Sequence, residues 1–203
     1  WCGWAKENNI PVCFDEVQAG FGRTGKMFGY EHYDVKPDLI VVGKALGGGM
    51  PISAVLGSAD LLDAPDDLSS THTGNPVCCA AALASLEVLE REGLVKQARR
   101  MGHVFVDAFE RMGISASGYM DIIKTDLYGT LVVNGNGMIW GIDLGDVDLA
   151  NQVVDKCAEK GLLLVKTHRG TIKIGPPLTI PTTIILDGLD ILKEAIKEVS
   201  NGK

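Results

Sequence analysis

A short apolar strand that leads into a lysine and three glycines constrains this chain more than any other feature. Residues 39–42 read Leu-Ile-Val-Val, four apolar residues in succession. Such a run is typical of a strand that is buried on both faces inside a parallel sheet. Lys44 follows after a single glycine, and Gly47, Gly48 and Gly49 come next. Because open α/β sheets bind ligands at the carboxyl ends of their strands, we expect an α/β fold with Lys44 at its ligand crevice.

A second charged residue, Asp15, follows the predicted strand Ile10 to Phe14, 29 positions before Lys44 (44 minus 15). If the two strands are parallel neighbours, the carboxylate and the amine share one crevice. This pair suits pyridoxal 5'-phosphate (PLP), whose aldehyde needs a lysine and whose pyridinium nitrogen needs an acidic partner. Each residue also has a plainer interpretation: Lys44 as an exposed lysine on a βα loop, and Asp15 as an aspartate that caps a turn.

Composition narrows the class of protein and its partners. The chain has 203 residues, of which 46% are apolar and 22% are charged, which is typical of a globular domain with a sizeable core. A net charge of −7 argues against nucleic-acid binding through a general electrostatic field. No stretch is apolar for the length of a membrane span, so we expect no membrane partner.

Cysteine and histidine usage gives expectations about compartment and metals. The five cysteines form no C-x-x-C pair and are odd in number, which favours reduced thiols and a cytoplasmic protein. The four histidines are scattered without the spacing of metal ligands, so we predict no metal site.

The chain divides near residue 92 in our interpretation. Residues 1–92 form part of a large α/β domain with a mainly parallel sheet, and residues 93–203 form a small C-terminal α+β domain. Asn75-Pro76 begins a helix that runs to about Arg91, since Asn is a good N-cap and Pro suits the first helical position.

Further elements are expected along the rest of the sequence. Residues 61–70 are polar and turn-like, and residues 134–137 read Asn-Gly-Asn-Gly, a strong hairpin signal. We expect helices over 94–112, 148–160 and about 182–199, and strands over 52–57, 131–133, 138–144, 162–167 and 171–174.

Several segments together resemble one enzyme family. They are residues 15–25 (DEVQAGFGRTG), 37–40 (PDLI), 43–49 (GKALGGG), 70–76 (STHTGNP), 137–144 (GMIWGIDL) and 176–180 (PPLTI). In this order they resemble the class III aminotransferases, PLP enzymes of fold type I that act on ornithine, acetylornithine, 4-aminobutyrate and related amines.

The resemblance implies roles for five residues. Lys44 would form the Schiff base with PLP and move the proton of the substrate carbon, and Asp15 would keep the pyridine nitrogen protonated. Gln18 would bind the phenolic oxygen. Val17 would pack on a ring face, although a plain core position explains it equally. Thr71 would reach the phosphate of a neighbouring subunit in a homodimer, although it is also an ordinary loop threonine.

We therefore expect an aminotransferase that moves an amino group from an amine or amino acid to a 2-oxo acid. The alternatives are a racemase/epimerase or decarboxylase of the same family. A non-catalytic fragment is a further alternative, because the chain begins inside a helical pattern without Met and resembles the family's C-terminal portion. Lys173 stands where many members carry an arginine for the substrate carboxylate, and it is alternatively a solvated strand residue.

Overall fold

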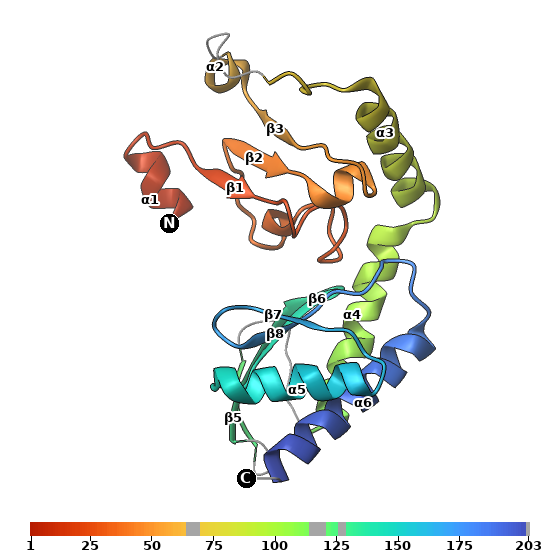
Figure 1. The fold of residues 1–203 in the computed structure, drawn as a ribbon. Helices are drawn as coiled ribbons and strands as arrows, with labels where there is room; N and C mark the ends of the chain where they lie inside the picture. Colours follow the sequence, from red (N-terminus) through yellow and green to blue (C-terminus); the bar gives the residue numbers. More distant parts are fainter. Residues whose placement is uncertain (64–69, 114–120, 126–128, 202–203) are drawn as a thin grey trace. The chain divides into compact units, whose positions relative to one another are not determined.

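Figure 1 shows the fold as a computed structural model, which describes residues 1–63, 70–113, 121–125 and 129–201. The chain forms two compact units, Trp1–Lys96 and Gln97–Lys203, and each is described by itself. The domain boundary near residue 92 stays a prediction. Among the described residues, no helix combines the length and the apolar character that crossing a bilayer requires.

The first unit contains a three-stranded sheet in the order β1-β2-β3. β1 and β2 pair in parallel, as predicted, with Asp15 opposite Val41. β3 pairs with β2 in the antiparallel direction, so the sheet formed by the described strands is mixed. The elements of this unit are α1 (Cys2–Glu7), β1 (Cys13–Asp15), η1 (Gly29–His32), β2 (Leu39–Val42), η2 (Lys44–Gly47), β3 (Ala54–Gly57), α2 (Ala59–Leu62) and α3 (Pro76–Arg91), where η marks a 3-10 helix.

The expectation that residues 39–42 are buried on both faces is met only at Val42, which is 2% exposed. The other three residues of β2 are half-buried, and Val55 and Leu56 of β3 are 47% and 43% exposed. The long helix α3 packs mainly against η2, and among the described strands β3 has β2 as its one neighbour. Residues 61–70 were predicted to be polar and turn-like. Leu61 and Leu62 belong to the end of α2, and residues 64–69 lie outside the described residues.

α3 begins where its sequence predicts. The side chain of Asn75 accepts hydrogen bonds from the backbone N–H groups of Val77 (3.0 Å) and Cys78 (3.4 Å), and Pro76 occupies the first helical position. The cap supplies an acceptor for donors that a helix N-terminus otherwise leaves unpaired.

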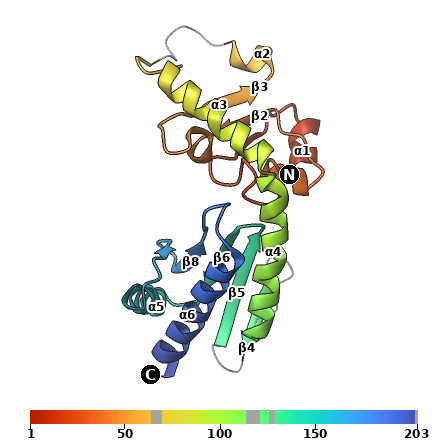
Figure 2. The ribbon, with the colours of Figure 1, turned by 90° about the vertical axis from the view of Figure 1, so that its right-hand side faces the viewer.

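The second unit contains a five-stranded antiparallel sheet in the order β4-β5-β6-β8-β7. Figure 2 shows α4 and α6 running beside β5 and β6. α4 begins with the last three residues of the first unit, 94–96. The elements are α4 (Leu94–Arg111), β4 (Asp121–Thr125), β5 (Gly129–Asn136), β6 (Ile139–Asp143), α5 (Val147–Glu159), β7 (Val165–Lys166), β8 (Thr171–Ile174) and α6 (Thr182–Asn201).

The predicted hairpin is present, but its turn is shorter than residues 134–137. Asn136 pairs with Ile139, so the loop consists of Gly137 and Met138. A two-residue loop suffices because Gly137 adopts a positive φ of 56°, which matches the twist of the flanking strands. β7 covers only two residues of the strand expected over 162–167, and β4 was not expected at all.

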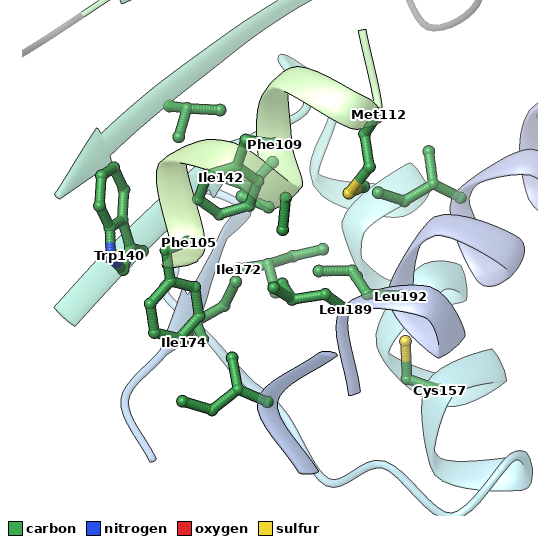
Figure 3. Close-up of a cluster of buried hydrophobic side chains, with 14 of the residues drawn as sticks. Phe105, Phe109, Met112, Trp140, Ile142, Cys157, Ile172, Ile174, Leu189 and Leu192 are labelled. Carbon is green, nitrogen blue, oxygen red and sulfur yellow. The ribbon is translucent and has the colours of Figure 1, made fainter. Parts of the chain in front are cut away.

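The core of this unit lies between the sheet and its three helices (Figure 3). Burial alternates along β6, where Trp140 and Ile142 are buried, and the same two residues pair with Ile174 and Ile172 of β8. The buried side chains therefore share one face of the sheet. Phe109 of α4 packs edge-on against Trp140, with ring centroids 5.3 Å apart.

Gly135 of β5 allows the Trp140 ring to lie across the strand. A Cβ on Gly135 would come within 2.4 Å of Trp140 Cδ2 and 2.5 Å of the Ile139 carbonyl oxygen. The indole Nε1 donates to the Gly137 carbonyl at 3.0 Å, which holds the ring in this place. Any side chain at position 135 must therefore displace a buried ring.

We expect Gly135→Ala to lower the free energy of unfolding by about 1 to 3 kcal/mol, because it overpacks the core. Gly175→Ala is the matched control, since a Cβ there would meet nothing within 4 Å. Its effect should stay within about 0.5 kcal/mol. Urea unfolding followed by Trp fluorescence measures both, and equal effects of the two substitutions would contradict the close packing at Gly135.

An ion pair joins the ends of α5 and α6. Lys160 Nζ lies 2.8 Å from Glu198 Oε1 and 3.4 Å from Glu194 Oε2. The hydrogen bond with Lys160 lowers the pKa of Glu198, and the same bond raises the pKa of Lys160.

The stabilisation from this pair should therefore be bounded by pH on both sides. It is present above the ordinary pKa of a glutamate and is lost as the pH falls through the lowered pKa of Glu198. On the alkaline side it is lost as the pH rises through the raised pKa of Lys160. The difference in unfolding free energy between wild type and Lys160→Met, measured by urea unfolding from pH 3 to 7, should shrink toward the acid end. Lys197→Met is the control, for which we expect a difference that stays constant with pH. A constant difference for Lys160→Met as well would rule out stabilisation by the ion pair.

Candidate active site

The parallel pairing of β1 and β2 places two predicted site residues at the same edge of the sheet. Asp15 is the last residue of β1 and lies opposite Val41. Lys44 follows Val41 by three positions (44 minus 41), at the start of η2. Because parallel strands end on the same side, the Asp15 carboxylate and the Lys44 amine both belong to the carboxyl edge of this sheet.

Two further predicted residues contact the Lys44 segment. Lys44 Nζ donates to Gln18 Oε1 at 3.5 Å, the long end of hydrogen-bond distance. Val17 Cγ1 lies 3.6 Å from where a Cβ on Gly43 would stand, so it packs beside the residue before the lysine. Asp15 is tied to the same turn, because its Oδ1 accepts from the Val17 N–H at 3.0 Å. Asp15, Val17, Gln18 and Lys44 therefore form one cluster.

Lys44 adopts an unusual backbone conformation. Its φ is 41°, in the left-handed region that L residues with a side chain avoid. Gly48 has a φ of 56°, and a Cβ on it would come within 2.4 Å of Ser85 Oγ on α3. The chain therefore needs glycine at position 48, while at position 44 it accepts strain on a lysine.

Thr71, the remaining predicted residue, lies in a different segment. It belongs to an exposed turn of residues 70–74, in which the Ser70 N–H donates to Thr73 Oγ1 at 3.0 Å. This turn precedes the Asn75 cap of α3. The contacts that join Val17, Gln18 and Lys44 do not include Thr71, so its role as a phosphate ligand stays a prediction.

Glu16 is a residue to which the sequence assigned no role. It is one of the two buried polar or charged side chains of the described chain, with 3% of its surface exposed. Its carboxylate accepts two backbone hydrogen bonds of 2.8 Å, from the N–H groups of Gly29 and Tyr30. One sequence feature could have indicated Glu16: it is an acidic residue between the end of a strand and a glycine-rich loop. Asp15 has the same position, so this feature does not distinguish the two residues.

One arginine adds positive charge to the glycine-rich loop. Arg23 is half-buried, and desolvation lowers the pKa of its guanidinium. An arginine stays protonated at neutral pH because its ordinary pKa is far above 7. Arg23 therefore contributes a cation to the loop that follows Gln18.

Lys173 belongs to the second unit. It lies on β8, is half-buried, and lines a pocket of about 350 Å³ whose walls are mostly apolar. Its neighbours in that wall include Leu164, Ile174 and Ile184. Half-burial does not decide between the two interpretations of Lys173, and its role at a substrate carboxylate stays a prediction.

The donor set of the cluster fits an organic cofactor better than a metal ion. Across the described ranges, no three His, Cys, Asp or Glu side chains gather closely enough to hold a metal. An amine, a carboxylate and an amide suit a group that carries an aldehyde, a basic ring nitrogen and a phenolic oxygen.

Comparison with known proteins shows the family. Residues 2–196 match the model of the family described as aminotransferase class-III. A leucine/methionine racemase of Thermococcus litoralis is 40% identical over 97% of this chain and 44% of its own length. An acetylornithine aminotransferase of Caldanaerobacter subterraneus is 34% identical over 95% of this chain and 46% of its own.

Solved structures agree with this result. Ornithine delta-aminotransferase of Plasmodium falciparum superposes with a TM-score of 0.84 at 31% identity, over 100% of this chain and 50% of its own. Ornithine aminotransferase of Toxoplasma gondii, solved with PLP at partial occupancy in its active site, superposes with a TM-score of 0.82 at 32% identity. The match covers 98% of this chain and 46% of that one. The fold is therefore that of part of a fold type I PLP transferase. The chain spans about half the length of the relatives it matches.

The strain at Lys44 predicts an unusual order of stability. Lys44→Gly relieves the left-handed backbone and should be more stable than Lys44→Ala by about 1 kcal/mol in urea unfolding. Lys26, an exposed lysine outside the set with positive φ, is the matched control. There the glycine variant should be the less stable one, because glycine gains entropy on unfolding. The same order at both positions would show that Lys44 is not strained.

Proposed function

Because this chain belongs to the class III aminotransferase family, we propose that it carries the reactive lysine of a PLP-dependent aminotransferase, Lys44. The observation that supports this most is the cluster at the carboxyl edge of β1 and β2. Asp15 ends one strand, and Lys44 follows the next one with its Nζ 3.5 Å from Gln18 Oε1. No other group of residues on the described chain combines a strained lysine with a neighbouring carboxylate and amide.

When bound, PLP would supply an aldehyde and a ring that withdraws electrons from the substrate carbon that bears the amine. Lys44 would provide the amine that holds that aldehyde, and its amine would then be the group that takes and returns the proton of the substrate carbon that bears the amine. Asp15 would accept a hydrogen bond from the protonated ring nitrogen, and a negatively charged carboxylate there would favour that protonated form.

Gln18 and Val17 orient the ring in this proposal. The amide nitrogen of Gln18 would donate to the phenolic oxygen, since an amide N–H₂ donates and its oxygen accepts, as Gln18 Oε1 does from Lys44 in this structure. Val17 packs beside Gly43 and offers an apolar surface to one ring face. Thr71 would bind the phosphate of a neighbouring subunit, which requires a homodimer.

The substrates follow from the family in coarse terms. We propose an amine or amino acid as the amino donor and a 2-oxo acid as the acceptor, in the cytoplasm. The relatives include enzymes named for ornithine, acetylornithine and 4-aminobutyrate. Each of these three small molecules carries an amine and a carboxylate. Lys173 in its half-buried position is a candidate for the substrate carboxylate, as a point charge without the fork of an arginine.

A second candidate function is amino-acid racemisation. The relative that supports it is the leucine/methionine racemase, which is 40% identical to this chain. Both reactions would remove a proton from the carbon that bears the amine through the same lysine, so Asp15, Gln18 and Lys44 do not distinguish them. A racemase returns the proton to the opposite face and needs no 2-oxo acid.

The first test is covalent trapping. We expect PLP added to residues 1–203 to give a visible absorption band, and borohydride followed by peptide mapping to place the adduct on Lys44. Lys44→Gly should lose the band and the adduct, whereas Lys26→Ala should keep both. A band that is absent, or an adduct spread evenly over exposed lysines, would contradict the proposal and favour a non-catalytic fragment.

Product analysis then separates the two reactions. Keto-acid formation that requires a 2-oxo acid acceptor supports an aminotransferase. Inversion of an L-amino acid without any acceptor supports a racemase, and chiral chromatography of the products measures both outcomes.

A further inference from the structure

Glu16 follows Asp15 directly in the chain, yet the two carboxylates have opposite surroundings. Asp15 is exposed, whereas Glu16 is buried. A carboxylate that leaves water must gain hydrogen bonds in exchange, because the bare charge is costly to bury. Glu16 gains two of them from consecutive residues: Oε2 accepts from the Gly29 N–H and Oε1 from the Tyr30 N–H, each at 2.8 Å.

The loop is shaped around this carboxylate. A Cβ on Gly29 would lie 3.2 and 3.3 Å from the two carboxylate oxygens and 3.1 Å from Ala19 Cβ. A Cβ on Gly20 would lie 2.8 Å from the backbone oxygen of Glu16. Glycine at both positions therefore lets residues 19–30 close onto Glu16.

The backbone of Glu16 holds the turn that contains Val17 and Gln18. Its N–H donates to the Val41 carbonyl at 2.9 Å, which extends the pairing of β1 with β2. Its carbonyl accepts from the Gly20 N–H at 2.9 Å, which closes the turn. Glu16 thus connects three segments: the end of β2, the turn with Gln18, and the start of η1.

From these contacts we propose that Glu16 is a positioning residue, whose buried carboxylate fixes the orientation of Asp15 and Gln18 at the cofactor site. The inference rests on the proposed function, because it assigns Glu16 to the same PLP site. A residue that only braced η1 would change stability, whereas a positioning residue also changes the environment of the groups that meet the cofactor ring.

Glu16→Gln is the variant that tests this. It keeps the size of the side chain but turns an amide N–H₂ toward one of the two backbone N–H groups, so one hydrogen bond and the charge are lost. Glu31→Gln is the matched control. Glu31 accepts from the Phe28 N–H at 3.1 Å and so caps the same short helix, but it does not adjoin Asp15.

Cofactor trapping on residues 1–203 gives the first readout. In Glu16→Gln, the PLP concentration for half-maximal borohydride trapping on Lys44 should rise about tenfold, the scale of one lost hydrogen bond at a buried group. The pH midpoint of the visible absorption band should move as well, because that band responds to the charge next to the ring nitrogen. Glu31→Gln should keep the midpoint and stay within about twofold in concentration.

Hydrogen exchange without cofactor gives the second readout. The amides of Val17 and Gly20 should exchange about tenfold faster in Glu16→Gln, and at the wild-type rate in Glu31→Gln. If Glu16→Gln does not fold, Gly29→Ala replaces it, since the added methyl group displaces the carboxylate without removing it.

The outcomes separate the two proposals. An unchanged pH midpoint or unchanged exchange at Val17 and Gly20 in Glu16→Gln would overturn the positioning role, and so would equal changes in Glu31→Gln. Wild type that traps no PLP on Lys44 would overturn the proposed function, while the exchange rates would still decide what Glu16 holds in place.

Discussion

The parallel pairing of β1 with β2 is the contact on which the candidate site depends. Its register sets Asp15 opposite Val41, and the chain then reaches Lys44 three residues later. A shift of the register by one residue would turn the side chains of β1 to the other face of the sheet. The hydrogen bond from the Glu16 N–H to the Val41 carbonyl continues the pairing beyond the last strand residue. The cluster therefore inherits its geometry from backbone hydrogen bonds rather than from contacts between its own side chains.

The two units differ in how they bury apolar surface. In the second unit, Val133 of β5 and alternate residues of β6 and β8 join one buried cluster with three helices, and the Trp140 ring packs closely against Gly135. In the first unit, Val55 and Leu56 of β3 stay largely exposed, and so does Leu83 of α3. Since apolar burial is the main favourable term in folding, the second unit has the larger source of stability of its own. The unit that carries Lys44 is also the one that leaves more of its apolar surface uncovered.

Much of this arrangement could be predicted from local patterns. The Asn75-Pro76 cap, the strand over residues 39–42 and a strand within residues 138–144 follow from propensity and spacing alone. The resemblance identified the family from six segments in order. The direction of β3 could not be predicted, because a short strand such as Ala-Val-Leu-Gly pairs equally well either way and the choice depends on the connection. The turn was predicted over residues 134–137 because the Asn-Gly pattern occurs twice there, but the register pairs Asn136 with Ile139 and leaves Gly137 and Met138 as the loop.

The role of Glu16 shows why a site is harder to predict than a fold. Residues 15 and 16 are both acidic, and the side chain of Glu16 is longer than that of Asp15 by one methylene group. Their different surroundings come from position: successive side chains at a strand end point to opposite faces, so one carboxylate meets solvent and the other meets the loop. The buried one is stable only because Gly29 and Tyr30, 13 and 14 residues later, present their N–H groups to it. Nothing local to the acidic pair encodes that contact. Gly20 and Gly29, which permit this contact, can be read from the sequence. Only the structure shows that they lie against Glu16.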